Sequence, residues 1–220
     1  MSSQIDVVFF DVGGPIYGDR PYYEGLLAGI KEVRPDADED EFWAEFQRCR
    51  QDQRGPFTQR LVGLFVDDAD ADRAIERGKE MWTYPPESLQ PDAKRALDVL
   101  HGRYRLGVLA NQERWIRQTM ARDGIDGYFD VWAISAELGV DKPEPGIFEH
   151  ALREAAAPAE RCVMVGDRLD NDIAAAKEQG MRAIWILRGE APPEPSPEQL
   201  AVADAAVASL EELPEALERL

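Results

Sequence analysis

The sequence has 220 residues, which suffices for one large domain or for a main domain with a smaller insertion. Hydrophobic residues make up 44% and charged residues 31%, a composition that argues against a largely disordered, collagen-like or coiled-coil chain. The formal net charge of −18 would repel polyanions, so we expect no nucleic acid and no anionic membrane among the partners.

The same sequence predicts neither export nor membrane insertion. It contains no run of about 18 apolar residues, and residues 1–4 lack the charged and apolar regions of a signal peptide. Cys49 and Cys162 are too few for a disulfide scaffold, and neither has a second cysteine or a histidine at metal-ligand spacing. We therefore expect a cytoplasmic protein.

Short apolar runs recur along the chain and predict strands that are buried on both faces of a parallel sheet. In chain order, these predicted strands cover residues 5–10, 106–110, 128–135, 162–165, 183–187 and 205–207. Segments with helical periodicity lie between and after them, at residues 92–104, 113–123, 146–155, 171–179 and 211–220. This alternation is typical of repeated βαβ units, so we expect a doubly wound α/β fold with a Rossmann-like sheet.

Residues 18–84 interrupt the alternation, because they contain several helix-like patterns and no convincing strand. One helical face is formed by apolar residues at i, i+3, i+4 and i+7, namely Tyr23, Leu26, Leu27 and Ile30. Two consecutive prolines, Pro85 and Pro86, then mark the return to the α/β pattern. We therefore expect a helical domain over residues 18–84, inserted into a core domain of residues 1–17 and 85–220.

Polar residues follow three of the predicted strands at the point where each strand ends. Asp11 follows the first strand, Asn111 follows the second, and Asp167 and Asp172 follow a later one. Because the carboxyl ends of parallel strands form the ligand-binding edge of an open sheet, we expect these residues to converge. Carboxylate oxygens suit a hard cation such as Mg²⁺, which is often shared with a substrate phosphate.

Four short motifs in this order resemble those of the haloacid dehalogenase-like hydrolases. They are Phe10-Asp11-Val12-Gly13-Gly14, Leu109-Ala110-Asn111, Lys142-Pro143 and Val165-Gly166-Asp167-Arg168-Leu169-Asp170-Asn171-Asp172. The resemblance extends over nearly the whole chain. A helical insertion between the first two motifs is similar to the subgroup of small-molecule phosphatases and 2-haloacid dehalogenases. The resemblance therefore implies that residues 18–84 are a cap domain over the Rossmann-like core.

The resemblance also implies a Mg²⁺-dependent phosphatase that acts on a small phosphorylated metabolite. Asp11 would attack phosphorus and form an aspartyl-phosphate, which water then hydrolyses. Asp11, the backbone carbonyl of Gly13, Asp167 and Asp172 would hold the metal ion.

The residues that the resemblance assigns to the substrate phosphate are Gly14, Asn111 and Lys142. Lys142 would shield the nucleophile Asp11 from the negative charge of the phosphate, and Asn111 would donate hydrogen bonds near the reacting group. For Gly14, a tight turn is also a sufficient explanation.

Two positions depart from the usual pattern of the family. Its phosphatases usually carry an aspartate two positions after the nucleophile as general acid and base, and here that position is Gly13. The usual serine or threonine of the second motif is Ala110. We therefore expect slow turnover unless a nearby residue supplies the proton, and the candidates are Asp19, Tyr17 and Glu24.

Two other functions remain open from the sequence. A 2-haloacid dehalogenase would also use an aspartate nucleophile, but it needs no metal and gives no role to Asp167 and Asp172. A non-catalytic or weakly catalytic binding protein with a retained metal and phosphate pocket is favoured by Gly13 and Ala110. Substrate specificity is expected to lie in cap residues that no motif identifies, and no pattern indicates an oligomeric state.

Overall fold

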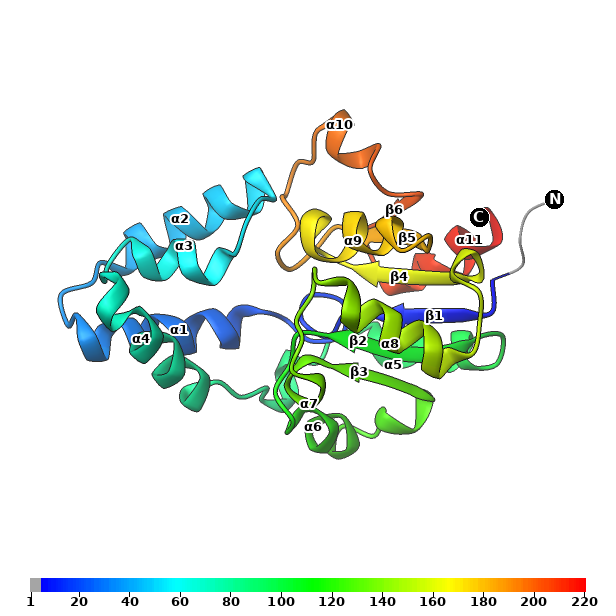
Figure 1. The fold of residues 1–220 in the computed structure, drawn as a ribbon, viewed down its shortest axis with the longest axis horizontal. Helices are drawn as coiled ribbons and strands as arrows, with labels where there is room; N and C mark the ends of the chain where they lie inside the picture. Colours follow the sequence, from blue (N-terminus) through cyan, green and yellow to red (C-terminus); the bar gives the residue numbers. More distant parts are fainter. Residues whose placement is uncertain (1–4) are drawn as a thin grey trace.

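The computed structural model describes residues 5–220. The expectation that residues 1–4 do not form part of a signal peptide concerns residues outside this range. The centre of the structure is one parallel sheet with the strand order β3-β2-β1-β4-β5-β6 (Figure 1). The strands are β1 (Val7–Phe10), β2 (Arg105–Ala110), β3 (Val131–Ile134), β4 (Cys162–Gly166), β5 (Arg182–Ile186) and β6 (Ala205–Val207). The chain adds strands on both sides of β1, so the predicted doubly wound α/β fold is confirmed.

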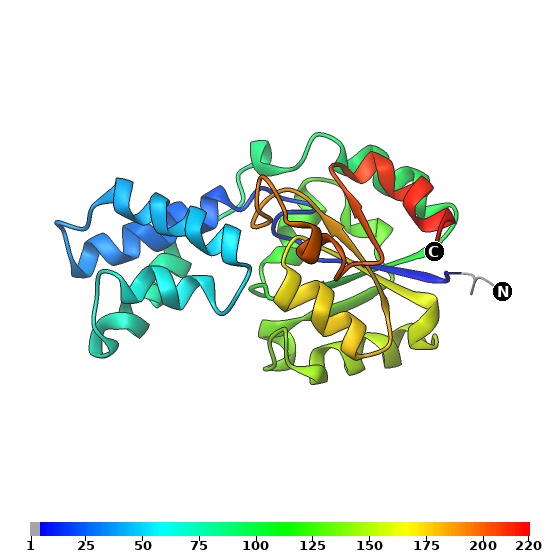
Figure 2. The same ribbon diagram turned by 90° about the horizontal axis from the view of Figure 1, so that it is seen from above.

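Helices cover both faces of the sheet because its central strands are apolar on both sides. Along β1, Val8 and Phe10 belong to one hydrophobic cluster, whereas Val7 and Phe9 belong to another on the opposite face. The first cluster includes α5 (Ala93–His101), α6 (Ile116–Arg122) and α11 (Leu213–Glu218), and the second includes α8 (Pro145–Ala155) and α9 (Ala175–Glu178). Figure 2 shows the red α11 beside the green α5, although these helices are far apart in the sequence.

Short elements complete the α/β part of the chain. They are α7 (Ser135–Leu138), α10 (Pro197–Leu200), the 3₁₀ helices η1 (Pro86–Ser88), η2 (Asp126–Tyr128), η3 (Ala159–Arg161) and η5 (Leu210–Glu212), and the π-helical η4 (Leu169–Ala174). The predicted helix over residues 171–179 therefore begins as η4 and continues as α9. Among residues 5–220, no helix combines the length and the apolarity needed to cross a membrane.

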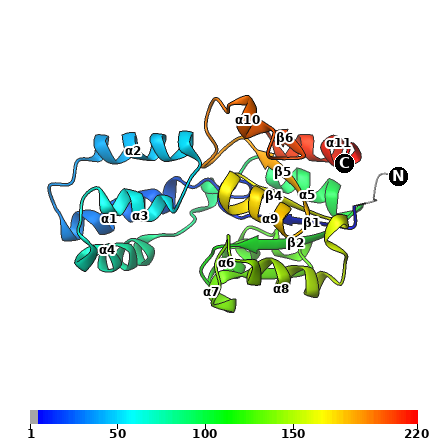
Figure 3. The same ribbon diagram turned by 45° about the horizontal axis from the view of Figure 1, so that its top comes forward.

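A group of four helices lies between β1 and β2 in the sequence and apart from the sheet in space. These helices are α1 (Arg20–Val33), α2 (Glu39–Asp52), α3 (Phe57–Gly63) and α4 (Asp68–Met81). Figures 1 and 3 show them together beyond the carboxyl ends of the strands. They enclose a hydrophobic cluster of their own, which includes Tyr23, Ile30, Phe42 and Leu61. These four helices lie within residues 18–84, for which the sequence predicts a helical domain, and we call them the helical lobe.

Helices α1 and α4 of the lobe pack with their backbones in direct contact. A Cβ atom on Gly29 of α1 would lie 2.5 Å from the backbone nitrogen of Gly78, and one on Gly78 of α4 would lie 2.9 Å from Cα of Leu26. Real Cβ atoms do not approach backbone atoms this closely, so the two glycines permit the helix contact.

Adding a methyl group at this contact is expected to destabilise the lobe. The variant Gly29→Ala should lower the free energy of unfolding by about 1–3 kcal/mol, because backbone atoms cannot move aside for the new side chain. Gly63→Ala is the matched control, since a Cβ atom there meets nothing within 4 Å. Urea unfolding measures both variants, and equal stabilities would contradict the close packing of α1 and α4.

Candidate active site

The first strand-end residue, Asp11, lies where β1 and β4 end side by side. Its backbone N–H donates to the Val165 carbonyl at 2.9 Å, which continues the pairing of the two strands. Its Oδ1 atom accepts a 2.8 Å hydrogen bond from the Val12 N–H and lies 3.0 Å from Nζ of Lys142. The same Nζ atom lies 2.5 Å from Oδ1 of Asp172, and the side chains of Lys142 and Asp172 are fully buried. One ammonium group thus bridges two carboxylates.

Asp167 completes a cluster of three carboxylates with Asp11 and Asp172. One carboxylate oxygen from each residue lies within 4.8 Å of the other two. Burial and the neighbouring carboxylates raise the pKa of Asp167 well above its ordinary value. Burial also raises the pKa of Asp11 to about 7, although Lys142 acts in the opposite direction. Lys142 pairs with Asp11 and Asp172 rather than with Asp167, so the cluster is short of positive charge.

This cluster fits a divalent metal ion. Its ligand atoms are all oxygens, which hard cations prefer, and an added cation would offset the mutual repulsion of the carboxylates. Gly13, whose carbonyl the family resemblance adds to these ligands, lines the same cavity as Asp11 and Asp167.

Two glycines allow the carboxylates to approach the ends of β1 and β4. A Cβ atom on Gly14 would overlap the carboxylate of Asp167, and one on Gly166 would overlap the side chain of Asp172. Gly14 also has a φ of +77°, which favours glycine. Its carbonyl accepts hydrogen bonds from Gln90 and Arg188, both at 3.1 Å. At Gly14 the close approach of the Asp167 carboxylate leaves no room for a side chain.

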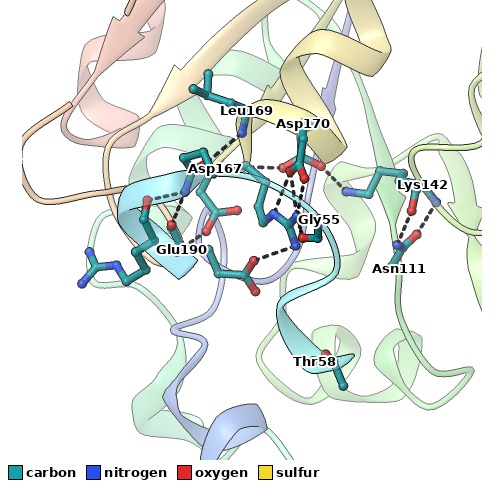
Figure 4. Close-up of polar contacts among 12 residues, drawn as sticks. Gly55, Thr58, Asn111, Lys142, Asp167, Leu169, Asp170 and Glu190 are labelled. Atoms are coloured by element: carbon teal, nitrogen blue, oxygen red, sulfur yellow. Dashed lines mark hydrogen bonds and ion pairs between the residues drawn. The ribbon is translucent and has the colours of Figure 1, made fainter. Parts of the chain in front are cut away.

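Asn111, at the end of β2, holds the main chain of Lys142 (Figure 4). Its Oδ1 atom accepts a 2.6 Å hydrogen bond from the Lys142 N–H, and its Nδ2 atom donates to the Lys142 carbonyl at 2.9 Å. Burial alone would lower the pKa of Lys142, but the attraction of Asp11 and Asp172 raises it above the ordinary value. Asn111 therefore positions the lysine that faces the carboxylates.

A cavity of about 840 Å³ opens over these residues and reaches the helical lobe. Asp11, Gly13 and Lys142 line it from the sheet, and Phe57 and Thr58 line it from α3. Gly14 is not among the described residues that line this cavity. The cavity therefore lies beside the Asp11 carboxylate, the buried Lys142 and the cluster of three carboxylates.

Two residues to which no sequence motif gave a role, Glu190 and Arg168, connect the sheet edge to the lobe. The Glu190 carboxylate accepts a 2.6 Å hydrogen bond from Tyr23 Oη and lies 3.4 Å from Arg168 Nη1. The Arg168 guanidinium donates to the Gly55 carbonyl at 2.8 Å and lies 4.0 Å from the ring centre of Phe57. The strand-end rule, applied to the predicted strand over residues 183–187, would have pointed to Glu190.

A comparison with known protein families supports the resemblance found in the sequence motifs. Residues 5–180 match the sequence profile of the haloacid dehalogenase-like hydrolases, which covers most of the chain. The chain belongs to this family. Its curated relatives include a phosphoserine phosphatase and glyceraldehyde 3-phosphate phosphatases.

Two curated relatives and one solved structure illustrate the similarity. A pyrimidine 5'-nucleotidase from Escherichia coli is 35% identical over 98 residues, which cover 44% of each chain. A phosphoserine phosphatase from Thermus thermophilus is 33% identical over 156 residues, or 66% of this chain and 61% of the relative. The chain thus spans about half the length of the curated relatives it matches. A HAD phosphatase from Thermococcus onnurineus has a TM-score of 0.65 at 25% identity, covering 97% of this chain and 98% of that one.

A divalent cation is expected to stabilise the folded protein through the carboxylate cluster. Adding Mg²⁺ at constant ionic strength should raise the melting temperature of the wild type, because an ion that binds only the folded state favours that state. Asp167→Asn should lose most of this shift. Asp126→Asn, which removes an exposed carboxylate, should keep it. Differential scanning fluorimetry measures the shifts, and equal shifts in all three proteins would contradict the metal site.

The raised pKa of Asp11 should make the stability of the metal-free protein depend on pH. Its carboxyl has a pKa of about 7 when folded and an ordinary value of 3.8, so the folded state binds this proton more tightly than the unfolded state. The free energy of unfolding should therefore decrease as the pH rises from 3.8 to about 7. Urea unfolding in the presence of a chelator, at about pH 5 and about pH 8, checks this. If Asp11→Asn shows the same decrease as the wild type, Asp11 is not its source.

Proposed function

We propose that this protein is a Mg²⁺-dependent phosphatase that acts on a small phosphorylated metabolite through an aspartyl-phosphate on Asp11. The observation that carries the proposal is the position of the Asp11 carboxylate. It lies on the wall of the cavity, 3.0 Å from Nζ of Lys142 and beside the carboxylates of Asp167 and Asp172. The proposed nucleophile Asp11, the ammonium group of Lys142 and the carboxylates that would hold the metal ion thus lie beside a cavity of metabolite size.

Electrostatics explain why this arrangement suits a phosphate ester. A phosphate dianion would be repelled by the carboxylates unless positive charge separates them. Lys142 supplies part of that charge, and Asn111 keeps the lysine in place through its main chain. Asp11, the Gly13 carbonyl, Asp167 and Asp172 would hold Mg²⁺, which neutralises charge and orients the phosphate when it is bound.

The chemical steps that the chain itself supplies begin at Asp11. One of its carboxylate oxygens would attack phosphorus in line with the leaving oxygen, and the Lys142 ammonium would reduce the repulsion between the two anions. Water would then cleave the aspartyl-phosphate, which releases inorganic phosphate and restores Asp11.

In this proposal, residues 18–84 act as a cap domain over the core of residues 1–17 and 85–220. The lobe has its own hydrophobic cluster, and Phe57 and Thr58 of α3 line the cavity. Contacts such as that of Arg168 with the Gly55 carbonyl support a position of the lobe against the sheet edge. A cap in this place would exclude water and select the substrate.

A substrate panel with and without Mg²⁺ tests the function. The wild type should hydrolyse p-nitrophenyl phosphate only when a divalent cation is present. Asp11→Asn should lower turnover by about 10³-fold or more, because no other group replaces the nucleophile. Asp126→Asn is the matched control and should leave the rate unchanged.

Other outcomes of the same panel identify the alternatives. Metal-independent halide release from a 2-haloacid would favour a dehalogenase. Binding of phosphate without turnover of any substrate would favour a binding protein. Phosphate release that is unchanged in Asp11→Asn would contradict the assignment of the nucleophile.

A further inference from the structure

Asp19 is a half-buried acidic residue at the start of α1. It occupies the N-cap position of α1, where an aspartate normally accepts a hydrogen bond from the first turn of the helix, but its side chain makes no such bond. Its Oδ2 atom is buried and has no hydrogen-bond partner among residues 5–220. A buried carboxylate oxygen without a partner costs stability, so a functional reason for its position is expected.

The Asp19 carboxylate fills the space that a side chain at position 13 would occupy. A Cβ atom built on Gly13 would lie 2.6 Å from Oδ1 of Asp19 and 3.5 Å from the Tyr84 hydroxyl. Gly13 is not one of the described glycines with positive φ, so its backbone conformation does not require glycine. Asp19 also lines the same cavity as Asp11. The missing side chain at Gly13 is thus replaced in space by a carboxylate six positions later.

The two other candidates for a proton donor point elsewhere. The Tyr17 hydroxyl donates a 2.8 Å hydrogen bond to Oδ2 of Asp123. Glu24 forms an exposed ion pair with Arg20 at 2.6 Å. Neither Tyr17 nor Glu24 is among the described residues that line the cavity, which leaves Asp19.

We propose that Asp19 is the catalytic proton-transfer residue of this phosphatase, an inference that rests on the proposed function. As Asp11 attacks phosphorus, the bond from phosphorus to the leaving oxygen breaks, and that oxygen takes the proton of the Asp19 carboxyl. The leaving group departs as an alcohol. A water molecule then attacks the phosphorus of the aspartyl-phosphate and gives a proton back to Asp19. The bond between Asp11 and phosphorus breaks, so phosphate leaves and both carboxyl groups return to their starting state.

The variant Asp19→Asn tests the proposal through the acidity of the leaving group. Turnover of an alkyl phosphate such as glycerol 2-phosphate should fall by about 10²-fold or more, because the alkoxide then leaves without a proton. p-Nitrophenolate needs little protonation, so its release in the first step should be spared. Because the second step also loses its base, rapid mixing should show a burst of nitrophenolate equal to the enzyme concentration, followed by slow turnover. Equal losses for both substrates without a burst would overturn the proposal.

A rescue experiment distinguishes proton transfer from a structural role. Asp19→Ala should lose alkyl-phosphate turnover, and adding Gly13→Asp to this variant should raise that turnover by about 10-fold or more, because a carboxyl group returns to the same space. Gly13→Asp alone should bring no gain, because Asp19 already fills the space. A gain of about 10²-fold from Gly13→Asp alone would show that the wild type lacks a proton donor and would overturn the proposal.

Controls separate the failure of this inference from the failure of the proposed function. Glu24→Gln, in the exposed ion pair with Arg20, should retain wild-type rates on both substrates. If the wild type with Mg²⁺ hydrolyses neither substrate, the phosphatase proposal fails, and the role of Asp19 fails with it. If the wild type hydrolyses both and Asp19→Asn does not discriminate between them, only the role of Asp19 fails.

Discussion

Repulsion among buried carboxylates at the carboxyl edge of the sheet is the constraint around which this site is arranged. Asp11, Asp167 and Asp172 bring oxygen atoms within 4.8 Å of one another, and two glycines at the strand ends make this approach sterically possible. Lys142 offsets part of the repulsion from a fully buried position, and Asn111 fixes that lysine by two hydrogen bonds to its main chain. The remaining deficit of positive charge explains why such an edge suits a divalent cation.

The helical lobe is joined to the same edge by charge and by stacking. Glu190 links Tyr23 of α1 to Arg168, and the Arg168 guanidinium lies over Phe57 of α3. These contacts connect loops of the sheet with two helices of the lobe, so the cavity is bounded by both parts of the chain. Residues of the lobe that line the cavity can therefore differ without disturbing the carboxylates, because the lobe has a separate hydrophobic core.

The relation of Gly13 to Asp19 shows that a missing motif residue need not mean a missing chemical group. After β1 the chain turns back on itself, with hydrogen bonds from the Ile16 and Tyr17 N–H groups to the Val12 carbonyl at 3.0 and 2.9 Å. This turn returns Asp19 to the space above Gly13. A linear motif identifies a residue by its position along the chain, whereas proton transfer depends on which oxygen atom lies near the reacting group in space.

Local patterns in the sequence were enough to predict the α/β class and helices between the first two strands. The ends of the predicted strands also pointed to Asp11, Asp167 and Asp172, whose carboxylate oxygens lie within 4.8 Å of one another. The apolar residues of β1 are fully buried on both faces, so a run of apolar residues is enough to indicate a strand of a parallel sheet. Parallel strands end at a common edge, so the residues that follow them are expected to lie close together. Only the tertiary structure decided what each polar group contacts. Asn111 holds Lys142, which lies 31 positions away, and Asp19 fills the space at Gly13. Such contacts depend on strand order and on the path of loops between elements, which are set by long-range packing and leave no periodic signal in the sequence.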